Sequence, residues 1–195
     1  MPYIIAIILL VVLIFILVGS NAYQREQREI KNAGNTGEAI FTSRIRGILR
    51  GDDVLINNIS LSVNGKEAEI DNLIINKNGI FIVEVKNYNG KLFGNTDDYE
   101  WTKVKISPGG NAFSKQVKNP IKQMKRQIYI LSQYLKENNI RIWINGYAYF
   151  INSNSPVNDE CVINDISELD RIIHKQQDKV YDEKVIHKAI NLLSI

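Results

Sequence analysis

The apolar positions of the chain form one uninterrupted block at the start and shorter periodic segments afterwards. Residues 3–18 carry no charge and are almost entirely aliphatic. At about 1.5 Å per residue, such a helix approaches the ~30 Å hydrocarbon core of a bilayer once its flanking residues are counted. A cleaved signal peptide is the alternative, but it requires a basic start that this segment lacks. The pattern therefore predicts a transmembrane anchor in the lipid bilayer.

The residues after this block are polar and predict a juxtamembrane helix or linker that stops before a folded unit. Arg25, Arg28 and Lys31 follow the block closely, so the positive-inside rule places the remainder of the chain in the cytoplasm. The predicted organisation is an anchor at residues 1–20, a linker at 21–33 and a domain at 34–151. A C-terminal extension of one strand and helices follows at residues 152–195.

From residue 37 on, the spacing of apolar residues changes repeatedly between helical and strand periods. Strands are predicted at residues 54–56, 59–63, 67–75, 80–87, 91–93, 100–106, 142–151 and 161–163. Helices are predicted at residues 37–50, from residue 114 or 119 to 136, and in two segments after residue 164. This order predicts an α/β fold in which helices flank a mixed sheet.

Charged residues interrupt the two most apolar strands. Asp71 lies in the first of them, and Glu84 and Lys86 lie in the second. An ion buried without a partner costs several kcal/mol, so these charges require an explanation. Alternation along a strand puts Glu84 and Lys86 on one face. A two-residue turn at 77–78, or a four-residue turn, sets Asp71 opposite Glu84, whereas a turn at 78–79 sets it opposite Lys86.

Two carboxylates about 5 Å apart repel each other unless a cation lies between them. Asp71 and Glu84 could therefore hold Mg²⁺ or Mn²⁺, with Lys86 orienting a bound water or helping to deprotonate it. This chemistry suits the hydrolysis of a phosphodiester. A cross-strand ion pair between Lys86 and one carboxylate explains the same pattern without a metal, and the pattern alone leaves both interpretations open.

Five segments, taken together, carry a resemblance to a known family. They are Gly37-Glu38, Glu69-Ile70-Asp71, residues 81–90, Trp101 and residues 119–123. In this order they resemble the nuclease-related domain family, NERD, over about residues 34–150. That family is grouped with the PD-(D/E)xK, restriction-endonuclease-like nucleases. The resemblance implies a core of a four-stranded mixed sheet flanked by helices, and Mg²⁺-dependent cleavage of DNA.

The resemblance also implies roles for individual residues. Asp71 and Glu84 look like the metal ligands, and Lys86 looks like the base that positions the attacking water. Glu38 is similar to the acid that the family's first helix supplies, and Gln123 to the polar residue that the long helix adds. The residue before Asp71 is not the proline of the superfamily's name.

Composition narrows the classes of function. The chain has 24 Lys and Arg against 21 Asp and Glu, which gives a net charge of +3. One cysteine and two histidines exclude a disulfide scaffold and a thiolate zinc module. We expect His174 and His187 to be ordinary helix-surface residues, and Trp101 to belong to the core.

Positive charges are concentrated between residues 102 and 126, where no acid occurs. If the long helix includes all of them, Lys115, Lys118, Lys122 and Lys125 form one stripe, with Arg126 beside it. Such a stripe can bind a nucleic-acid backbone, and the alternatives are a solvated face or contact with anionic lipid.

The combined prediction is a membrane-anchored nuclease that uses Mg²⁺ or Mn²⁺ to hydrolyse DNA, with RNA as the other candidate substrate. The competing hypothesis is a catalytically weak nucleic-acid-binding or adaptor module held at the membrane.

Overall fold

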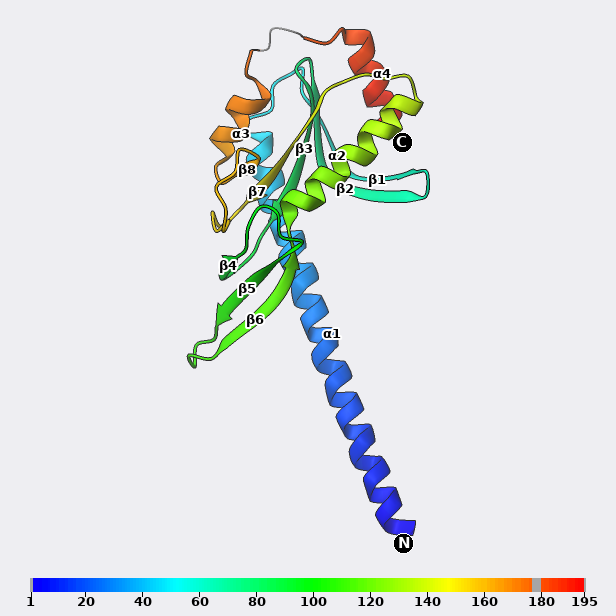
Figure 1. Cartoon of the computed structure of the whole chain (residues 1–195), viewed down its shortest axis with the longest axis vertical. Helices are drawn as coiled ribbons and strands as arrows, with labels where there is room; N and C mark the ends of the chain where they lie inside the picture. Colours follow the sequence, from blue (N-terminus) through cyan, green and yellow to red (C-terminus); the bar gives the residue numbers. More distant parts are fainter. Residues whose placement is uncertain (1, 177–179, 195) are drawn as a thin grey trace. The chain divides into compact units, whose positions relative to one another are not determined.

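The computed structural model describes residues 2–176 and 180–194, and Figure 1 gives the order of the elements. Contacts divide the chain into two compact units, residues 1–36 and residues 37–195. Helix α1 (Pro2–Arg46) provides the first unit and its last ten residues belong to the second. Among the described residues, no helix combines the length and apolar character needed to cross a membrane. The predicted anchor at residues 3–18 falls mostly on positions whose side chains lie outside the described part of the chain.

Helix α1 is continuous from Pro2 to Arg46, so the juxtamembrane segment is helical and runs into the second unit without the break in secondary structure that the sequence suggested at residues 34–37. Gly34 and Gly37 lie within the helix, where each glycine costs only about 1 kcal/mol relative to alanine. A proline would remove a backbone hydrogen bond and break the helix, but this segment has none. The Thr36 hydroxyl instead donates to the carbonyl of Asn32 at 2.8 Å, within the same helix.

The second unit is built around a five-stranded sheet in the order β1-β2-β3-β7-β8. The strands are β1 (Val54–Val63), β2 (Lys66–Asn76), β3 (Gly79–Lys86), β7 (Ile144–Phe150) and β8 (Val162–Ile163). The first three pair antiparallel, and β3, β7 and β8 pair parallel. The predicted mixed sheet is confirmed, with one strand more than the four that the resemblance implies.

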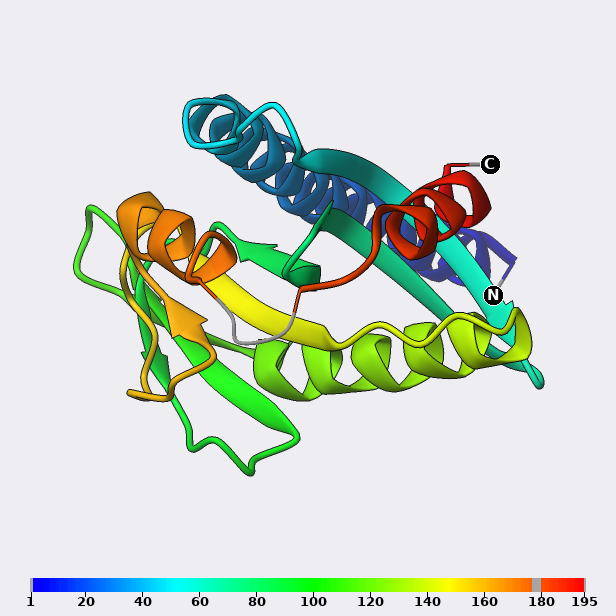
Figure 2. The ribbon, with the colours of Figure 1, turned by 90° about the horizontal axis from the view of Figure 1, so that it is seen from above.

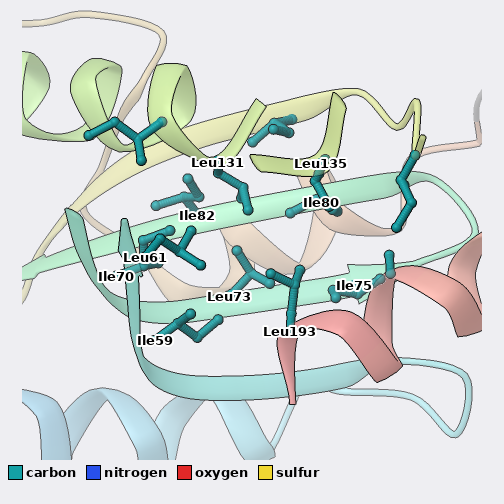
Figure 3. Close-up of a cluster of buried hydrophobic side chains, with 14 of the residues drawn as sticks. Ile59, Leu61, Ile70, Leu73, Ile75, Ile80, Ile82, Leu131, Leu135 and Leu193 are labelled. Carbon is teal, nitrogen blue, oxygen red and sulfur yellow. The ribbon is translucent and has the colours of Figure 1, made fainter. Parts of the chain in front are cut away.

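Helices cover both faces of this sheet (Figure 2). Helices α2 (Pro120–Glu137) and α4 (Glu183–Leu193) pack on one face, and the end of α1 with α3 (Ile166–Ile173) packs on the other. The α2 and α4 face is aliphatic: Ile70, Leu73 and Ile82 from the strands meet Leu131 from α2 and Leu193 from α4 (Figure 3). This packing fixes α2 over β3, which carries two of the predicted site residues.

A separate three-stranded sheet lies between β3 and α2 in the sequence. Its strands are β4 (Lys91–Phe93), β5 (Glu100–Ile106) and β6 (Ala112–Lys118). Trp101 of β5 is fully buried, stacks on Phe150 at 6.1 Å between ring centroids, and donates its indole N–H to the Asn95 carbonyl at 2.8 Å. The prediction that Trp101 belongs to the core is confirmed.

The long helix begins at Pro120, the later of the two predicted starts. Asn119 is its N-cap and accepts a hydrogen bond from the backbone N–H of Ile121 at 2.9 Å. A residue before proline is biased towards extended backbone, and the preceding segment pairs with β5 as a strand. Lys115 and Lys118 therefore lie on β6, and the predicted lysine stripe along one helix is wrong.

Candidate active site

The turn between β2 and β3 determines which charged residues face each other. Asn76 pairs with Gly79 across a two-residue turn. Continued along the strands, this register sets Asp71 opposite Glu84. It excludes the other predicted arrangement, in which Asp71 faces Lys86.

Strand β2 bends away from β3 before it reaches this position. The last paired residues are Leu73 and Ile82. Ile70 and Leu73 are three positions apart and pack in the same core cluster, although strict alternation would place them on opposite faces. At the bend, the buried Asn72 donates its side-chain amide to the carbonyl of Val83 at 3.4 Å. The ladder thus ends before the two carboxylates, which belong to strands that have begun to diverge.

Glu84 is the centre of a buried polar cluster. Its side chain is 1% exposed, and its Oε1 accepts a hydrogen bond from Lys86 Nζ at 2.6 Å. Lys86 Nζ also donates to Gln123 Oε1 at 3.2 Å. The structure therefore brings together three of the predicted site residues, from β3 and from the first turns of α2.

Gln127 is a fourth member of this cluster that the sequence analysis missed. Its Nε2 donates to Glu84 Oε2 at 2.7 Å and to the Glu69 carbonyl at 2.8 Å, and the residue is 2% exposed. A flipped amide would set Oε1 against two acceptors, so the hydrogen bonds fix its orientation. Gln127 follows Gln123 by four positions, which places both on one face of α2. This spacing of four positions from Gln123 is the sequence signal that could have identified Gln127 as a member of the site.

Asp71 stands in a strongly negative environment. Burial and the neighbouring Glu84 carboxylate raise its pKa from 3.8 to about 6, and Glu38 and Glu69 act in the same direction. The Lys86 ammonium lowers this pKa but does not offset those effects. The predicted metal ligands and the predicted acid of the first helix therefore lie within electrostatic range of one another.

Gly37 allows α1 to bring Glu38 close to the end of β3. A Cβ atom at this position would lie 2.8 Å from the Cβ of Asn87 and 3.4 Å from Cδ1 of Ile151. The first of these contacts is closer than side chains tolerate, so the helix can approach the sheet here only because residue 37 has no side chain. This close approach gives a steric reason for a glycine before Glu38 in this structure.

Lys86 is a cation rather than a base in this arrangement. Burial is the largest single influence and disfavours the charged form, but Glu84, Tyr88 and Asp71 together outweigh burial, so the pKa of Lys86 lies above the usual lysine value. An ammonium ion can orient water or stabilise negative charge, but it has no lone pair with which to accept a proton. The geometry favours the orienting role over direct deprotonation of water.

The residues present fit a hard divalent cation. Mg²⁺ is commonly held by one or two carboxylates with water completing its shell, and Asp71 and Glu84 supply two carboxylates. The raised pKa of Asp71 reflects burial first and the neighbouring carboxylates second, and a bound cation would favour the ionised carboxylate against both. Within the described ranges, no group of three or more His, Cys, Asp or Glu side chains forms a metal cage. The site suits an ion that keeps several of its waters.

The predicted basic residues are divided between two elements. Lys118 of β6 joins Lys122 and Arg126 of α2 in lining a groove of about 810 Å³, together with Gln123 and Gln127. The remaining two lie elsewhere. Lys115 is opposite Lys103 in the register of β5 and β6. Lys125 lies near Asp159, where hydrogen bonds from Cys161 chiefly lower the pKa of the carboxyl and the Lys125 charge adds to this effect.

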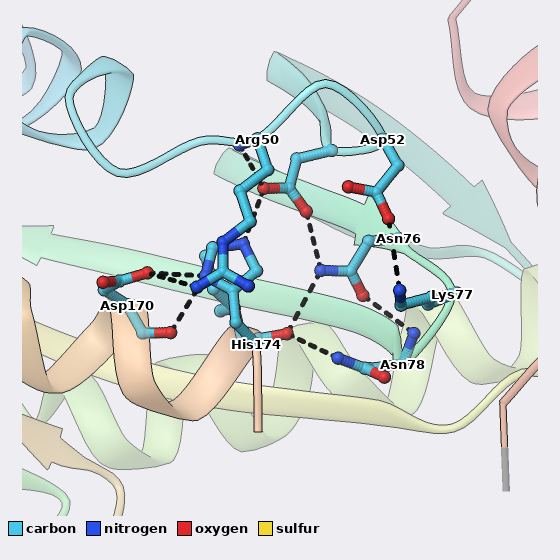
Figure 4. A network of polar contacts seen from close by, with 9 residues as sticks. Arg50, Asp52, Asn76, Lys77, Asn78, Asp170 and His174 are labelled. Carbon is cyan, nitrogen blue, oxygen red and sulfur yellow. Dashed lines mark hydrogen bonds and ion pairs between the residues drawn. The ribbon is translucent and has the colours of Figure 1, made fainter. Parts of the chain in front are cut away.

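His174 is not the helix-surface residue that the sequence suggested. Its side chain is 7% exposed, with Nδ1 2.6 Å from Asp170 Oδ1 and Nε2 2.7 Å from Asp53 Oδ2 (Figure 4). Asn76 and Asn78, at the turn before β3, both donate to the carbonyl oxygen that ends α3. This network lies at the opposite end of β3 from Lys86, and it joins α3 to the turn. His187 is exposed, as expected.

Comparison with known proteins gives one family. The family model described as nuclease-related domain matches residues 33–151. No curated protein and no solved structure matches the chain significantly. The matched range contains every residue of the Glu84 cluster as well as Glu38 and Asp71.

Proposed function

Because the chain belongs to the nuclease-related domain family, we propose that it is a metal-dependent nuclease that hydrolyses phosphodiester bonds of DNA. The observation that carries the proposal is the buried contact of Lys86 with both Glu84 and Gln123, beside an Asp71 whose pKa is raised to about 6. A binding module has no need of converging carboxylates, which repel phosphate. An ion-pair network alone does not need the second carboxylate.

In hydrolysis, the oxygen of a water molecule attacks phosphorus, and the bond from phosphorus to one deoxyribose oxygen breaks, while that oxygen takes up a proton. The products are a phosphate monoester and a free hydroxyl group. A bound Mg²⁺ or Mn²⁺ would supply Lewis acidity and lower the pKa of the attacking water. Asp71 and Glu84 would hold it.

Lys86 has three ammonium protons, and its hydrogen bonds to Glu84 and Gln123 use two of them. We assign the third to the attacking water or to a phosphate oxygen, whose negative charge grows in the transition state. Gln127 keeps the Glu84 carboxylate in place from the other side. Glu38 adds negative charge close to Asp71 and would strengthen cation binding.

The test is cleavage of linear, nicked and single-stranded DNA by the full chain in a non-ionic detergent, with Mg²⁺, Mn²⁺ or EDTA. Asp71→Asn and Lys86→Met are expected to lose about 100-fold or more in rate. Lys136→Met, an exposed lysine in the last turn of α2, is the matched control and should cleave normally. Metal-independent cleavage, or equal activity in all variants, would refute the proposal. Salt-sensitive DNA binding without cleavage would favour the binding module.

We also propose that residues 3–18 anchor the protein in a membrane, with the domain on the cytoplasmic side. The support is the uncharged sequence of this segment and the basic residues Arg25, Arg28 and Lys31 that follow it. Alkaline extraction of membranes from cells that express the full chain tests the anchoring. An anchored protein stays in the pellet, and release into the supernatant would contradict the proposal.

A further inference from the structure

The groove next to the Glu84 cluster has properties that the catalytic residues do not explain. One wall is the β1–β2 hairpin, and the other is formed by the end of β6 and the first turns of α2. Gln123 and Gln127 line it, and the same two side chains contact Lys86 and Glu84. The groove therefore borders the candidate active site and shares two side chains with it.

The wall formed by β6 and α2 is positively charged. Lys118, Lys122 and Arg126 line it, and the first turn of α2 has no acidic residue that would oppose the positive end of the helix dipole. Lys122 contacts Asp97 at 3.5 Å, but this aspartate side chain is 96% exposed, so water and salt weaken the pair. Glu67 and Glu69 line the opposite wall. An anion is accordingly directed towards α2 and away from the hairpin.

An aromatic ring stands at the same groove. Tyr99 is 79% exposed, although it is large and apolar over most of its surface. Its backbone is held firmly, because its carbonyl accepts a hydrogen bond from the Asn119 N–H at 3.2 Å. The Asn119 side chain also donates to the carbonyls of Thr96 and Asp98, at 3.0 and 2.8 Å. The ring is thus an exposed face on a rigid support.

We propose that this groove binds one unpaired strand of nucleic acid, with a base stacked on Tyr99 and its phosphates on Lys118, Lys122 and Arg126. An aromatic ring can stack only on a base whose face is free, which a duplex offers only at an end. A groove of about 810 Å³ has the size of a small-ligand pocket, so it accepts a short stretch of one strand. The inference rests on the proposed function, because it identifies the substrate form of the same site.

The experiment measures binding in EDTA, so that it does not depend on cleavage. Fluorescence anisotropy measures the affinity of the full chain for three labelled ligands: a single strand of DNA, a single strand of RNA of the same sequence, and the blunt DNA duplex. Tighter binding of the single strands than of the duplex is expected. Tyr99→Ala should weaken single-strand binding between about 5-fold and 100-fold, and Tyr99→Phe should restore it, since stacking requires the ring and not the hydroxyl.

The basic wall is tested by the salt dependence of the same binding. Lys122→Ala and Arg126→Ala should each reduce the slope of log K against log salt by about 0.7, the value for one phosphate contact on a single strand. Lys136→Ala, an exposed lysine on the same helix outside the groove, should leave the slope unchanged. Equal losses on single strand and duplex in Tyr99→Ala, or unchanged slopes in the groove variants, would overturn the proposal.

The two proposals fail separately. Metal-dependent cleavage by a protein whose single-strand binding is insensitive to Tyr99 would remove the groove assignment and leave the nuclease. Tyr99-dependent binding without any cleavage would establish the groove and remove the nuclease. A preference for RNA over DNA within the single-strand arm would identify the sugar that the groove accepts.

Discussion

Replacing Asp71 with asparagine is expected to stabilise the folded chain at neutral pH while it removes a proposed metal ligand. Burial, Glu84 and two further carboxylates raise the Asp71 pKa from 3.8 to about 6 in the folded state. The folded state therefore binds this proton more tightly than the unfolded chain does. The resulting stability is fully present below pH 3.8 and is lost as the pH rises through about 6.

The size of the effect follows from this shift. At about 1.36 kcal/mol per pKa unit, a rise from 3.8 to about 6 corresponds to about 3 kcal/mol of stability lost above pH 6. Asp71 retains part of its contact with water, so solvent screening reduces the expected figure to roughly 1–2 kcal/mol. Asparagine has no carboxyl group to ionise. The free energy of unfolding of Asp71→Asn, relative to that of the parent chain, should therefore rise by this amount between pH 4 and pH 7.5.

Urea unfolding of the full chain in EDTA, followed by tryptophan fluorescence, measures this gain, because Trp101 is fully buried in the fold. Any constant difference in packing between the two side chains cancels when pH 4 is compared with pH 7.5. Asp97→Asn is the control, since that aspartate side chain is 96% exposed. A difference between Asp71→Asn and the parent that does not change with pH would refute the electrostatic argument.

Three other substitutions test the supports of the site. Gln127→Leu leaves two buried acceptors without their donor, and we expect cleavage to fall about 10- to 100-fold in steady-state assays. An unchanged rate would show that the Gln127 amide does not position Glu84 for cleavage. Gly37→Ala brings a Cβ within 2.8 Å of Asn87 Cβ, so cleavage should fall about tenfold. Gly34→Ala is the control: its Cβ meets nothing within 4 Å, so this variant should keep full activity and gain helix stability. His174→Ala removes the side chain that joins two carboxylates, and urea unfolding should show a loss of about 2–4 kcal/mol; a loss below 1 kcal/mol would mean that the network contributes little.

Most of the sheet could be predicted because its signals are local. Alternating apolar residues identified the strands, and the turn between β1 and β2 falls at Asn64-Gly65, a dipeptide typical of two-residue hairpin turns, with φ values of 50° and 73°. The start of α3 also carries a local signal, since Asp165 is of the residue type favoured at an N-cap and accepts a hydrogen bond from the Ser167 N–H. Strand β6 was missed because its exposed, lysine-rich sequence has spacing that fits a helix surface equally well.

The site was only partly predictable for a different reason. Asp71, Glu84 and Lys86 were detectable because a charge in an apolar strand is unusual. Gln127 carries no charge, and a helical glutamine is ordinary until its hydrogen bonds across two strands are seen. His174 was misjudged because its partner Asp53 is distant in sequence, and no local pattern reports such a contact.

The amide of Gln127 links groove width to carboxylate position. Through one nitrogen it holds the Glu69 carbonyl on the hairpin wall and the Glu84 carboxylate on β3, while its own backbone belongs to the α2 wall. The hairpin cannot move away from α2 without breaking one of these hydrogen bonds or drawing the amide with it. A change in the distance between the two walls would therefore also act on the Glu84 carboxylate, because one side chain links the proposed strand-binding groove to a proposed metal ligand.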